Sequence, residues 1–496
     1  MLELITGING KVNGFVWGLP MLVLLVGTGI LMTCLTKVFQ ISHFGYWMKH
    51  TLGSIFTDKH ITAHTGKEDK SITQFQSLCT ALAATIGTGN IVGVSSALLF
   101  GGPGAIFWMW IVAFFGMMTN YSENVLGIYY RRKSNKGEWS GGAMYYLRDG
   151  LGAKRGMKPV GAVLAVLFSV FCLLASFGIG NMSQINSIAG NMKAAFGIPN
   201  VVSGILLMIL AGLVVLGGIK RIASVTEMLV PFMAIFYIVG SLILCIRNAG
   251  QVIPAFASIF KGAFAMKAVG GGIVGSGIKM AVTWGMKRGV FSNEAGLGSS
   301  VMVHSSSNVR EPVRQGMWGI FEVFADTIVV CSLTALTVLT SGLVDLDTGV
   351  VISQAEGSAL VGEAFAKVFG QWGPMFIAVA ILLFAFSTVL GWSHYGSKAF
   401  EYLFGSGAII VYQVIFIVFI LCGATMSLEL AWDLSDTFNG LMAIPNLIGV
   451  LALSPIVCEI TKNYVDRRIR GINTEPMLSA FPDIQKAQEQ ELDGSE

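Results

Sequence analysis

Long apolar runs, separated by short polar breaks, are the feature that most limits what this chain can fold into. The first run, residues 14–36, would extend about 35 Å as a helix, which exceeds the thickness of the hydrocarbon core of a bilayer. The chain is 54% hydrophobic and only 12% charged, whereas soluble globular chains carry roughly 25% charged residues. The sequence therefore predicts a membrane protein and argues against a soluble enzyme, a secreted scaffold or a nucleic-acid binder.

Eleven apolar runs are long enough to cross the membrane as helices, which predicts an all-α polytopic fold. The first run lacks the basic segment that precedes the apolar part of a signal peptide, so we expect it to remain as an uncleaved helix. Four shorter amphipathic pieces, at 43–56, 139–150, 251–266 and 355–369, are expected to lie along the membrane surface. The runs cover 14–36, 74–100, 104–130, 159–188, 200–218, 222–247, 274–303, 314–341, 372–397, 407–423 and 428–463.

Lysine and arginine residues are distributed unequally between the two sets of loops. The loops after the odd-numbered runs, together with the C-terminal tail, hold 23 of them, and the opposite loops hold 6. Because cytoplasmic loops carry the excess of basic residues, this bias predicts an extracellular N-terminus and a cytoplasmic C-terminus in the cell membrane.

Six segments follow from this division of the chain. Residues 1–36 are an extra N-terminal transmembrane helix, and residues 37–73 are a cytoplasmic loop with an amphipathic helix. Two five-helix units, 74–250 and 274–463, are joined by an extracellular connecting helix within 251–273. The mixed charges and prolines of residues 464–496 predict a disordered cytoplasmic tail.

The two five-helix units share a weak internal repeat. Because each unit holds an odd number of helices, the second must enter the membrane from the opposite side, which predicts an inverted repeat. Transporters use this architecture, and their binding sites lie near the midplane where the repeats meet. The matches, at offsets between 203 and 211 residues, pair Asn90 with Asn293, Gly93 with Gly296, Met109 with Met317, Thr119 with Thr327, Met233 with Met442 and Gly240 with Gly449.

Each unit begins with a helix that the sequence interrupts at mid-membrane. Thr85–Asn90 contains two glycines and two threonines, and Arg288–Gly298 contains three glycines, an asparagine and a glutamate. Such stretches are poor helix formers, and unwound backbone at membrane depth persists only where it lines a polar cavity. Its free N–H groups suit a carboxylate, and its free carbonyls suit an ammonium or a small cation. The breaks therefore fit a zwitterionic amino acid with Na⁺, although close helix packing at Gly87, Gly89 and Gly93 is an alternative explanation.

Two segments carry a resemblance to a known family. At Ala84–Gly93 (ATIGTGNIVG), and more specifically at Arg288–Ser299 (RGVFSNEAGLGS), the chain resembles the alanine/glycine:cation symporter family. The resemblance implies a leucine-transporter-like fold of the APC superfamily, with five plus five inverted helices, one extra N-terminal helix and discontinuous first and sixth core helices. It also implies Na⁺-coupled, sometimes H⁺-coupled, uptake of small neutral amino acids. Further matching segments are Trp17–Pro20, Asp326-Thr327, Gly391-Trp392, Glu401–Gly405 and Trp432–Gly440.

The candidate substrate-binding residues lie at the two breaks and on two helices that the resemblance places beside them. Asn90 and Asn293 either cap a half-helix or bind substrate or ion. Thr88 either satisfies freed backbone groups locally or binds the substrate. Phe291 and Trp392 either form apolar walls for a small side chain or serve as plain packing. The full set is Thr85, Gly87, Thr88, Gly89, Asn90, Gln184, Phe291, Asn293 and Trp392.

The resemblance further implies a cation site between the first break and the eighth core helix. Hard cations prefer oxygen ligands, and the site would contain no carboxylate. The two hydroxyls alternatively bond back to their own helix. The five oxygen donors would be the carbonyls of Ala83, Ile86 and Phe384 and the hydroxyls of Ser387 and Thr388.

Glu294 is a carboxylate within the membrane, beside the second break. Because burial of an ionised carboxylate is costly, this residue is expected to have a partner or a function. It either binds the substrate ammonium or a coupling ion, acting as a coupling or gating carboxylate, or it pairs with Arg288 six residues earlier.

The expected function is Na⁺-coupled symport of a small neutral amino acid, such as alanine or glycine, into the cell by alternating access. Na⁺ is the expected metal ion, and we expect no other cofactor. The alternatives are a proton-coupled, glutamine-selective or serine-selective carrier of the same family, a channel, and a non-transporting amino-acid sensor. The sequence holds no HExxH motif, nucleophile elbow or P-loop, so it does not predict an enzyme or an ATP-driven pump. We expect a monomer in the lipid bilayer that binds no nucleic acid.

Overall fold

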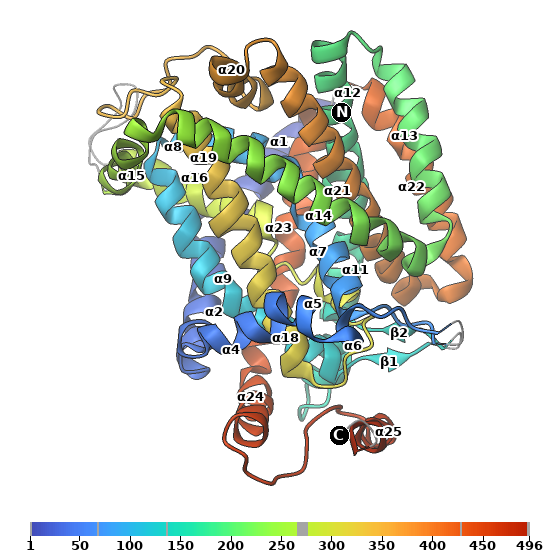
Figure 1. The fold of residues 1–496 in the computed structure, drawn as a ribbon. Coiled ribbons are helices and arrows are strands. Elements are labelled where there is room, and N and C mark those ends of the chain that lie inside the picture. The colour runs from blue at the N-terminus through green and yellow to red at the C-terminus, as the bar shows by residue number, and fades with distance from the viewer. Residues whose placement is uncertain (1, 67–68, 135–136, 265–275, 427–428, 494–496) are drawn as a thin grey trace.

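The computed structural model describes residues 2–66, 69–134, 137–264, 276–426 and 429–493. Helices make up almost all of its regular structure, and the described ranges contain one sheet of two short antiparallel strands, β1 (Arg132–Lys133) and β2 (Trp139–Ser140). Figure 1 shows long helices standing side by side, with the strands and the C-terminus at the lower end and α20 (Ser358–Phe369) at the upper end. The predicted all-α class is therefore confirmed.

Seven helical stretches among the described residues are long and apolar enough to cross a membrane, and nine if each of two sharply bent pairs counts as one span. A shorter apolar helix, α13 (Asn200–Val215), comes in addition. The predicted total of eleven spans stays a prediction, because the remaining predicted spans are short or interrupted in the structure.

The first five-helix unit opens with the predicted broken helix. The chain bends by 58° between α7 (Gln74–Thr85) and the following stretch Thr88–Gly101, which consists of η2 (Thr88–Asn90) and α8 (Val92–Gly101). The later helices of this unit are α9 (Gly104–Tyr129), α11 (Lys158–Phe177), the π-helical η4 (Gly178–Met182), α12 (Ser183–Phe196), α13 and α14 (Gly218–Arg247).

The second unit likewise begins with an interrupted helix, which further helices follow. It opens with α16 (Ser276–Asn293) and α17 (Val301–His304), separated by irregular backbone. The predicted last span, 428–463, is bent by 59° where α23 (Glu429–Ala452) meets α24 (Ser454–Arg468). The helices between are α18 (Pro312–Val323), η5 (Phe324–Cys331), α19 (Ser332–Thr340), α21 (Trp372–Phe404), η6 (Ser406–Ala408) and α22 (Ile409–Thr425).

The extra N-terminal helix expected over residues 1–36 consists of α1 (Leu2–Val16) and α2 (Leu19–Leu35). The two separate where Gly18 is extended and Pro20 occupies the first turn of α2. Trp17, at this junction, donates from Nε1 to the carbonyl of Asp436 on α23 at 3.0 Å. Farther along, α2 packs against α9. This helix therefore lies against both five-helix units.

Short helices form the expected surface segments. The described part of 251–266 corresponds to α15 (Ala249–Ala263), residues 265 and 266 lying outside the described residues, and 355–369 corresponds to α20. The segment 139–150 is helical only from α10 (Ala143–Tyr145) into η3 (Tyr146–Leu151). The segment 43–56 is made of several short pieces that continue one another. They are α4 (Phe44–Met48), η1 (Lys49–Gly53) and α5 (Ser54–Thr57), with α3 (Phe39–Ser42) before them and α6 (Lys59–Thr62) after them.

A parallel bridge joins the segment before α7 to the segment after α17. The N–H of Ile72 donates to the carbonyl of Ser306 (3.1 Å), and the N–H of Asn308 donates to the carbonyl of Ile72 (2.8 Å). Arg131, buried just beyond α9, donates to the carbonyl of Ser307 (2.6 Å). The lower ends of α7, α9 and α17 are thereby held together.

The C-terminal segment differs from the disordered tail expected for residues 464–496. After α24 the chain is extended and then forms α25 (Pro482–Asp493). The N–H of Ala480 donates to the carbonyl of Tyr129 (2.9 Å), Leu478 is fully buried, and Arg310 pairs with Glu491 (3.1 Å). Proline and charge content describe only the average solubility of a segment, so they do not reveal such individual contacts.

Candidate functional site

The first break lies where α7 ends. The helix begins with a reciprocal cap, since Thr73 Oγ1 accepts from the N–H of Gln76 (3.0 Å) while the Gln76 side chain accepts from the N–H of Thr73 (3.1 Å). It ends at Thr85, whose hydroxyl donates back to the helix, and Ile86 and Gly87 then leave helical geometry. The break is therefore confirmed at the predicted glycine, and the Thr85 hydroxyl is used by its own helix.

Gly87 occupies a position with no room for a side chain. A Cβ there would lie 2.4 Å from Thr388 Oγ1 and 3.3 Å from Gln184 Oε1. The same Gln184 oxygen accepts from the N–H of Thr88 (3.3 Å), and Asn90 Oδ1 accepts from the N–H of Gly87 (2.9 Å). The structure thus brings α12 and α21 against the first break, where side-chain amide oxygens accept from the buried N–H groups of Gly87 and Thr88.

The second break covers residues 294–300, between α16 and α17. Asn293, the last residue of α16, forms an Asx turn into the break, since its Oδ1 accepts from the N–H of Ala295 (3.0 Å), and its Nδ2 donates to Thr327 Oγ1 (3.0 Å). Glu294 has a φ of 56° and Gly296 a φ of 92°. A positive φ costs glycine little but costs a residue with a Cβ about 1–3 kcal/mol, so the surroundings must hold Glu294 in place.

A buried carboxylate, Asp326 in η5, joins the first break to the end of α16, just before the second break. It accepts hydrogen bonds from Asn90 Nδ2 (2.6 Å), from Ser292 Oγ (2.8 and 3.0 Å to its two oxygens) and from Thr327 Oγ1 (2.8 Å). Neither Asp326 nor Ser292 was a candidate site residue. The signal that points to them is that Asp326-Thr327 and the segment around Ser292 both carry the family resemblance.

Glu294 faces α21 and does not pair with Arg288. Its Oε1 accepts from Trp392 Nε1 (2.9 Å), and its Oε2 accepts from Ser299 Oγ (2.5 Å). The guanidinium of Arg288 instead lies over the ring of Phe291, 5.5 Å from its centroid. Of the two alternatives for Glu294, the ion pair with Arg288 is therefore not formed, because α16 ends just before Glu294, whose positive φ turns the side chain away from the helix.

Four of the five predicted cation ligands lie together. Ser387 Oγ donates to the carbonyl of Phe384 (2.7 Å) and lies 3.3 Å from the carbonyl of Ala83 on α7. Thr388 Oγ1 donates to the carbonyl of Phe384 as well (3.0 Å). Both hydroxyls therefore bond back to their own helix, and one also reaches the first break. Among the described residues, Ile86 forms no hydrogen bond to α21.

The two aromatic candidates lie against backbone at the breaks. A Cβ on Gly89 would be 3.2 Å from the ring of Phe291, and a Cβ on Gly180 would be 2.4 Å from Trp392. Phe291 is 7% exposed and Trp392 is 1% exposed. Phe291 thus covers the first break, and Trp392 fills the space between η4 and the second break.

A cavity of about 510 Å³ reaches the candidate substrate residues. Thr88 and Phe291 line it, together with Arg288, Glu356 and Asp436. The cavity gives a ligand a route to the first break, through surroundings that carry charges of both signs.

Comparison with known proteins identifies a family over most of the chain. A family model described as the sodium:alanine symporter family matches residues 2–478. The chain is 45% identical over 457 residues to a protein of Methanococcus maripaludis named sodium/alanine symporter AgcS, covering 92% of this chain and 96% of that one. It is 34% identical over 479 residues to a Bacillus subtilis protein named probable sodium/glutamine symporter GlnT, covering 95% and 93%.

Two solved structures share the fold at low sequence identity. A Na⁺-coupled sialic acid symporter aligns with a TM-score of 0.53 at 12% identity, covering 95% of this chain and 96% of that one. MhsT in complex with L-phenylalanine aligns with a TM-score of 0.51 at 14% identity, covering 79% and 99%. These likenesses support the predicted leucine-transporter-like fold.

Proposed function

Because the chain belongs to the sodium:alanine symporter family, we propose that it imports a small neutral amino acid, such as alanine or glycine, together with Na⁺. The observation that supports this proposal is the meeting of two broken membrane helices around buried polar groups, with Gly87 in contact range of Gln184 and Thr388. We propose that the protein binds its ligand at this site and releases it unchanged, as a carrier does, in agreement with the relatives that are named as symporters.

The substrate carboxylate is proposed to bind at the first break. The N–H groups of Gly87 and Thr88 are directed at the side-chain oxygens of Asn90 and Gln184. A carboxylate that replaces these neutral oxygens gains stronger, charge-assisted hydrogen bonds at the start of a half-helix. Carbonyls at the other half-helix end, or Glu294, are the candidates to hold the ammonium group.

Na⁺ is proposed to bind where α21 meets the end of α7. The carbonyls of Ala83 and Phe384 and the hydroxyls of Ser387 and Thr388 supply neutral oxygen ligands. A hydroxyl that donates to a carbonyl still offers its lone pairs, and a small rotation turns them towards an ion. A fifth ligand from Ile86 would complete the site.

Phe291 and Trp392 are proposed to limit the size of the substrate side chain. Replacing Trp392 by alanine should weaken alanine binding and improve tolerance of a larger neutral amino acid, because the large ring excludes bulk by overpacking at about 1–3 kcal/mol. Competition of unlabelled amino acids against labelled alanine measures this ranking. The Trp392→Phe variant serves as a control, since it keeps most of the bulk but cannot donate to Glu294. An unchanged ranking in Trp392→Ala would show that this wall does not select the substrate.

Uptake into liposomes tests the function itself. Purified protein should accumulate labelled alanine or glycine under an inward Na⁺ gradient, and K⁺ in place of Na⁺ should abolish the accumulation. Relatives named as a sodium/glutamine symporter and as a putative sodium/proton-dependent alanine carrier make glutamine and a pH gradient the necessary comparisons. Binding without uptake would indicate a sensor, and uptake driven by a pH gradient alone would indicate proton coupling.

The proposed topology places the lower end of Figure 1 in the cytoplasm of a multi-pass cell-membrane protein, here taken as a monomer. Cysteines introduced at the exposed positions Lys133 and Lys486 should therefore be labelled only from the cytoplasmic side, and a cysteine at Asp347 only from outside. A membrane-impermeant maleimide, applied to intact cells and to inverted vesicles, distinguishes these cases. Labelling of positions 133 and 347 from the same side would contradict the inverted repeat.

A further inference from the structure

Arg288 on α16 lines the cavity that leads to the first break, and it does so without a polar partner. Its guanidinium lies over the rings of Trp284 and Phe291, 5.3 Å and 5.5 Å from their centroids. In the part of the chain that the structure describes, its buried Nε has no hydrogen-bond partner and the guanidinium forms no ion pair. An arginine in a predicted membrane span is costly, and such residues pair with an acid or mark the path of a ligand. The two rings fix the side chain and leave its N–H groups free to bind an anionic group.

Two further buried atoms on the wall of this cavity lack a partner among the described residues. Asp436 pairs through Oδ2 with Nζ of Lys287 (2.9 Å), whereas its Oδ1 accepts no hydrogen bond. The hydroxyl of Thr88, at the first break, is buried and unpaired in the same way, so it does not satisfy a freed backbone group. Buried polar atoms without partners are costly, and their concentration around one cavity points to a ligand that supplies the partners.

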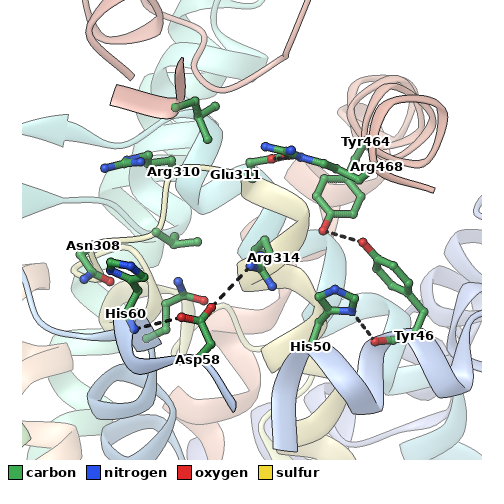
Figure 2. Close-up of a pocket in the computed structure, with 13 residues that line it drawn as sticks. Tyr46, His50, Asp58, His60, Asn308, Arg310, Glu311, Arg314, Tyr464 and Arg468 are labelled. Carbon is green, nitrogen blue, oxygen red and sulfur yellow. Dashed lines mark hydrogen bonds and ion pairs between the residues drawn. The ribbon is translucent and has the colours of Figure 1, made fainter. Parts of the chain in front are cut away.

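The polar cavity at the lower end of the bundle shows the contrast. It has a volume of about 540 Å³, and Figure 2 shows an arginine on its wall directed at an acid. Each of the three arginines that line it has a carboxylate partner within the protein. The pairs are Arg314 with Asp58 (4.0 Å), Arg310 with Glu491 (3.1 Å) and Arg468 with Glu311 (2.7 Å). Arg288 has no such partner within the described ranges, so the upper cavity can accept an anionic group.

The charges around the upper cavity favour a zwitterion over a simple anion. Glu356, Asp433 and Asp436 line the cavity together with Arg288, and Asp436 lies within electrostatic reach of the guanidinium. These carboxylates repel a simple anion, whereas an amino acid offers a carboxylate to the guanidinium and an ammonium to an acid. The volume of about 510 Å³ lies in the range of small-molecule sites.

We propose that this cavity is a second binding site for the amino acid, in which Arg288 binds the carboxylate and Oδ1 of Asp436 binds the ammonium. The inference rests on the proposed function, because the ligand is the transported amino acid. Thr88 belongs both to the wall of the cavity and to the first break, so the two sites adjoin. Glu356 directly precedes α20 at the upper end, the proposed outer side. An amino acid from outside therefore reaches this cavity before it reaches the first break.

Equilibrium binding of labelled alanine to the purified full chain, at saturating Na⁺, counts the sites. The unmodified protein should bind two molecules per chain. Arg288→Gln should bind one, because loss of the charge that holds the carboxylate should weaken the second site about tenfold or more. Lys261→Gln is the matched control, since it removes the same charge from an exposed position on α15. It should bind two.

Gly87→Ala separates the two sites. The new Cβ blocks the first break, and Gly87 does not line the cavity. This variant should bind one alanine, and its combination with Arg288→Gln should bind none. Ser96 lines the cavity, so alanine should slow the modification of Ser96→Cys by a membrane-impermeant maleimide, also when Gly87→Ala is present.

The proposal is overturned if the unmodified protein binds one alanine per chain, or if Arg288→Gln binds two or none. Failure of alanine to protect Ser96→Cys in the presence of Gly87→Ala overturns it as well. Should Arg288→Gln fail to fold, two alanines on the unmodified protein and one on Gly87→Ala support the second site, and none on Gly87→Ala excludes it. Two bound alanines without Na⁺-driven uptake would instead count against the proposed function and leave the second site standing.

Discussion

Alanine in place of Gly87 should lower Na⁺-driven uptake roughly tenfold to a hundredfold. The new Cβ would lie 2.4 Å from Thr388 Oγ1 and 3.3 Å from Gln184 Oε1, so it displaces a proposed cation ligand and a proposed substrate ligand together. The loss comes from occupied space and not from backbone strain, because the φ of Gly87, −133°, is open to any residue. Initial rates at varied alanine and Na⁺ should show that both half-maximal concentrations rise.

Gly190→Ala is the matched control for this experiment. Gly190 lies on α12, the helix that carries Gln184, and a Cβ there would meet nothing within 4 Å. Uptake by this variant should equal that of the unmodified protein, and its helix should be slightly more stable. Normal uptake by Gly87→Ala would mean that neither ligand binds where α7 meets α21.

Removal of one hydroxyl from α21 should raise the Na⁺ concentration for half-maximal uptake. In Ser387→Ala and Thr388→Ala the ion loses one of few ligands, which should cost about 1–3 kcal/mol, or five- to more than a hundredfold in Na⁺ affinity. The affinity for the amino acid at saturating Na⁺ should change little, because the substrate is proposed to bind on the other side of the break. Alanine uptake measured over a Na⁺ series separates the two quantities.

Ser393→Ala provides the comparison for these variants. Ser393 is buried on the same helix and donates only to the carbonyl of Leu390 (2.6 Å). The variant therefore removes a hydroxyl that makes no contact with the first break. Its Na⁺ dependence should be unchanged. If Ser387→Ala and Thr388→Ala behave like Ser393→Ala, the cation site lies elsewhere.

The architecture could be predicted from the sequence because its determinants are local. Helix length follows from runs of apolar residues, and the two breaks follow from glycines at mid-membrane, which lower helix propensity wherever they occur. The structure places the breaks at Gly87 and at Glu294, and it brings Gln184 and Thr388 beside the first of them. The family resemblance supplied these two long-range neighbours, which the spacing of residues alone does not contain.

The polar contacts inside the site could not be predicted in the same way. Ser292 and Asp326 are separated by 34 residues, and only the packing of α16 against η5 brings them together. Arg288 and Glu294 are close in sequence and opposite in charge, yet the end of α16 directs them apart. Sequence distance predicts side-chain contacts only while the backbone stays regular, and functional sites of this kind are built where it does not.

The bridge between Ile72 and Ser307 leaves α7 without an independent pivot at its lower end. In a transport cycle that rocks one group of helices against the rest, α7 must move together with α17 and α9 as one rigid group. The other side of α7 rests on α14 through the paired hydroxyls of Thr80 and Thr226 (2.8 Å) and through Gln76 and Glu227 (2.9 Å). Release of substrate at the lower end, the proposed cytoplasmic side, would therefore require α7 to separate from α14, because α7 cannot move outward alone.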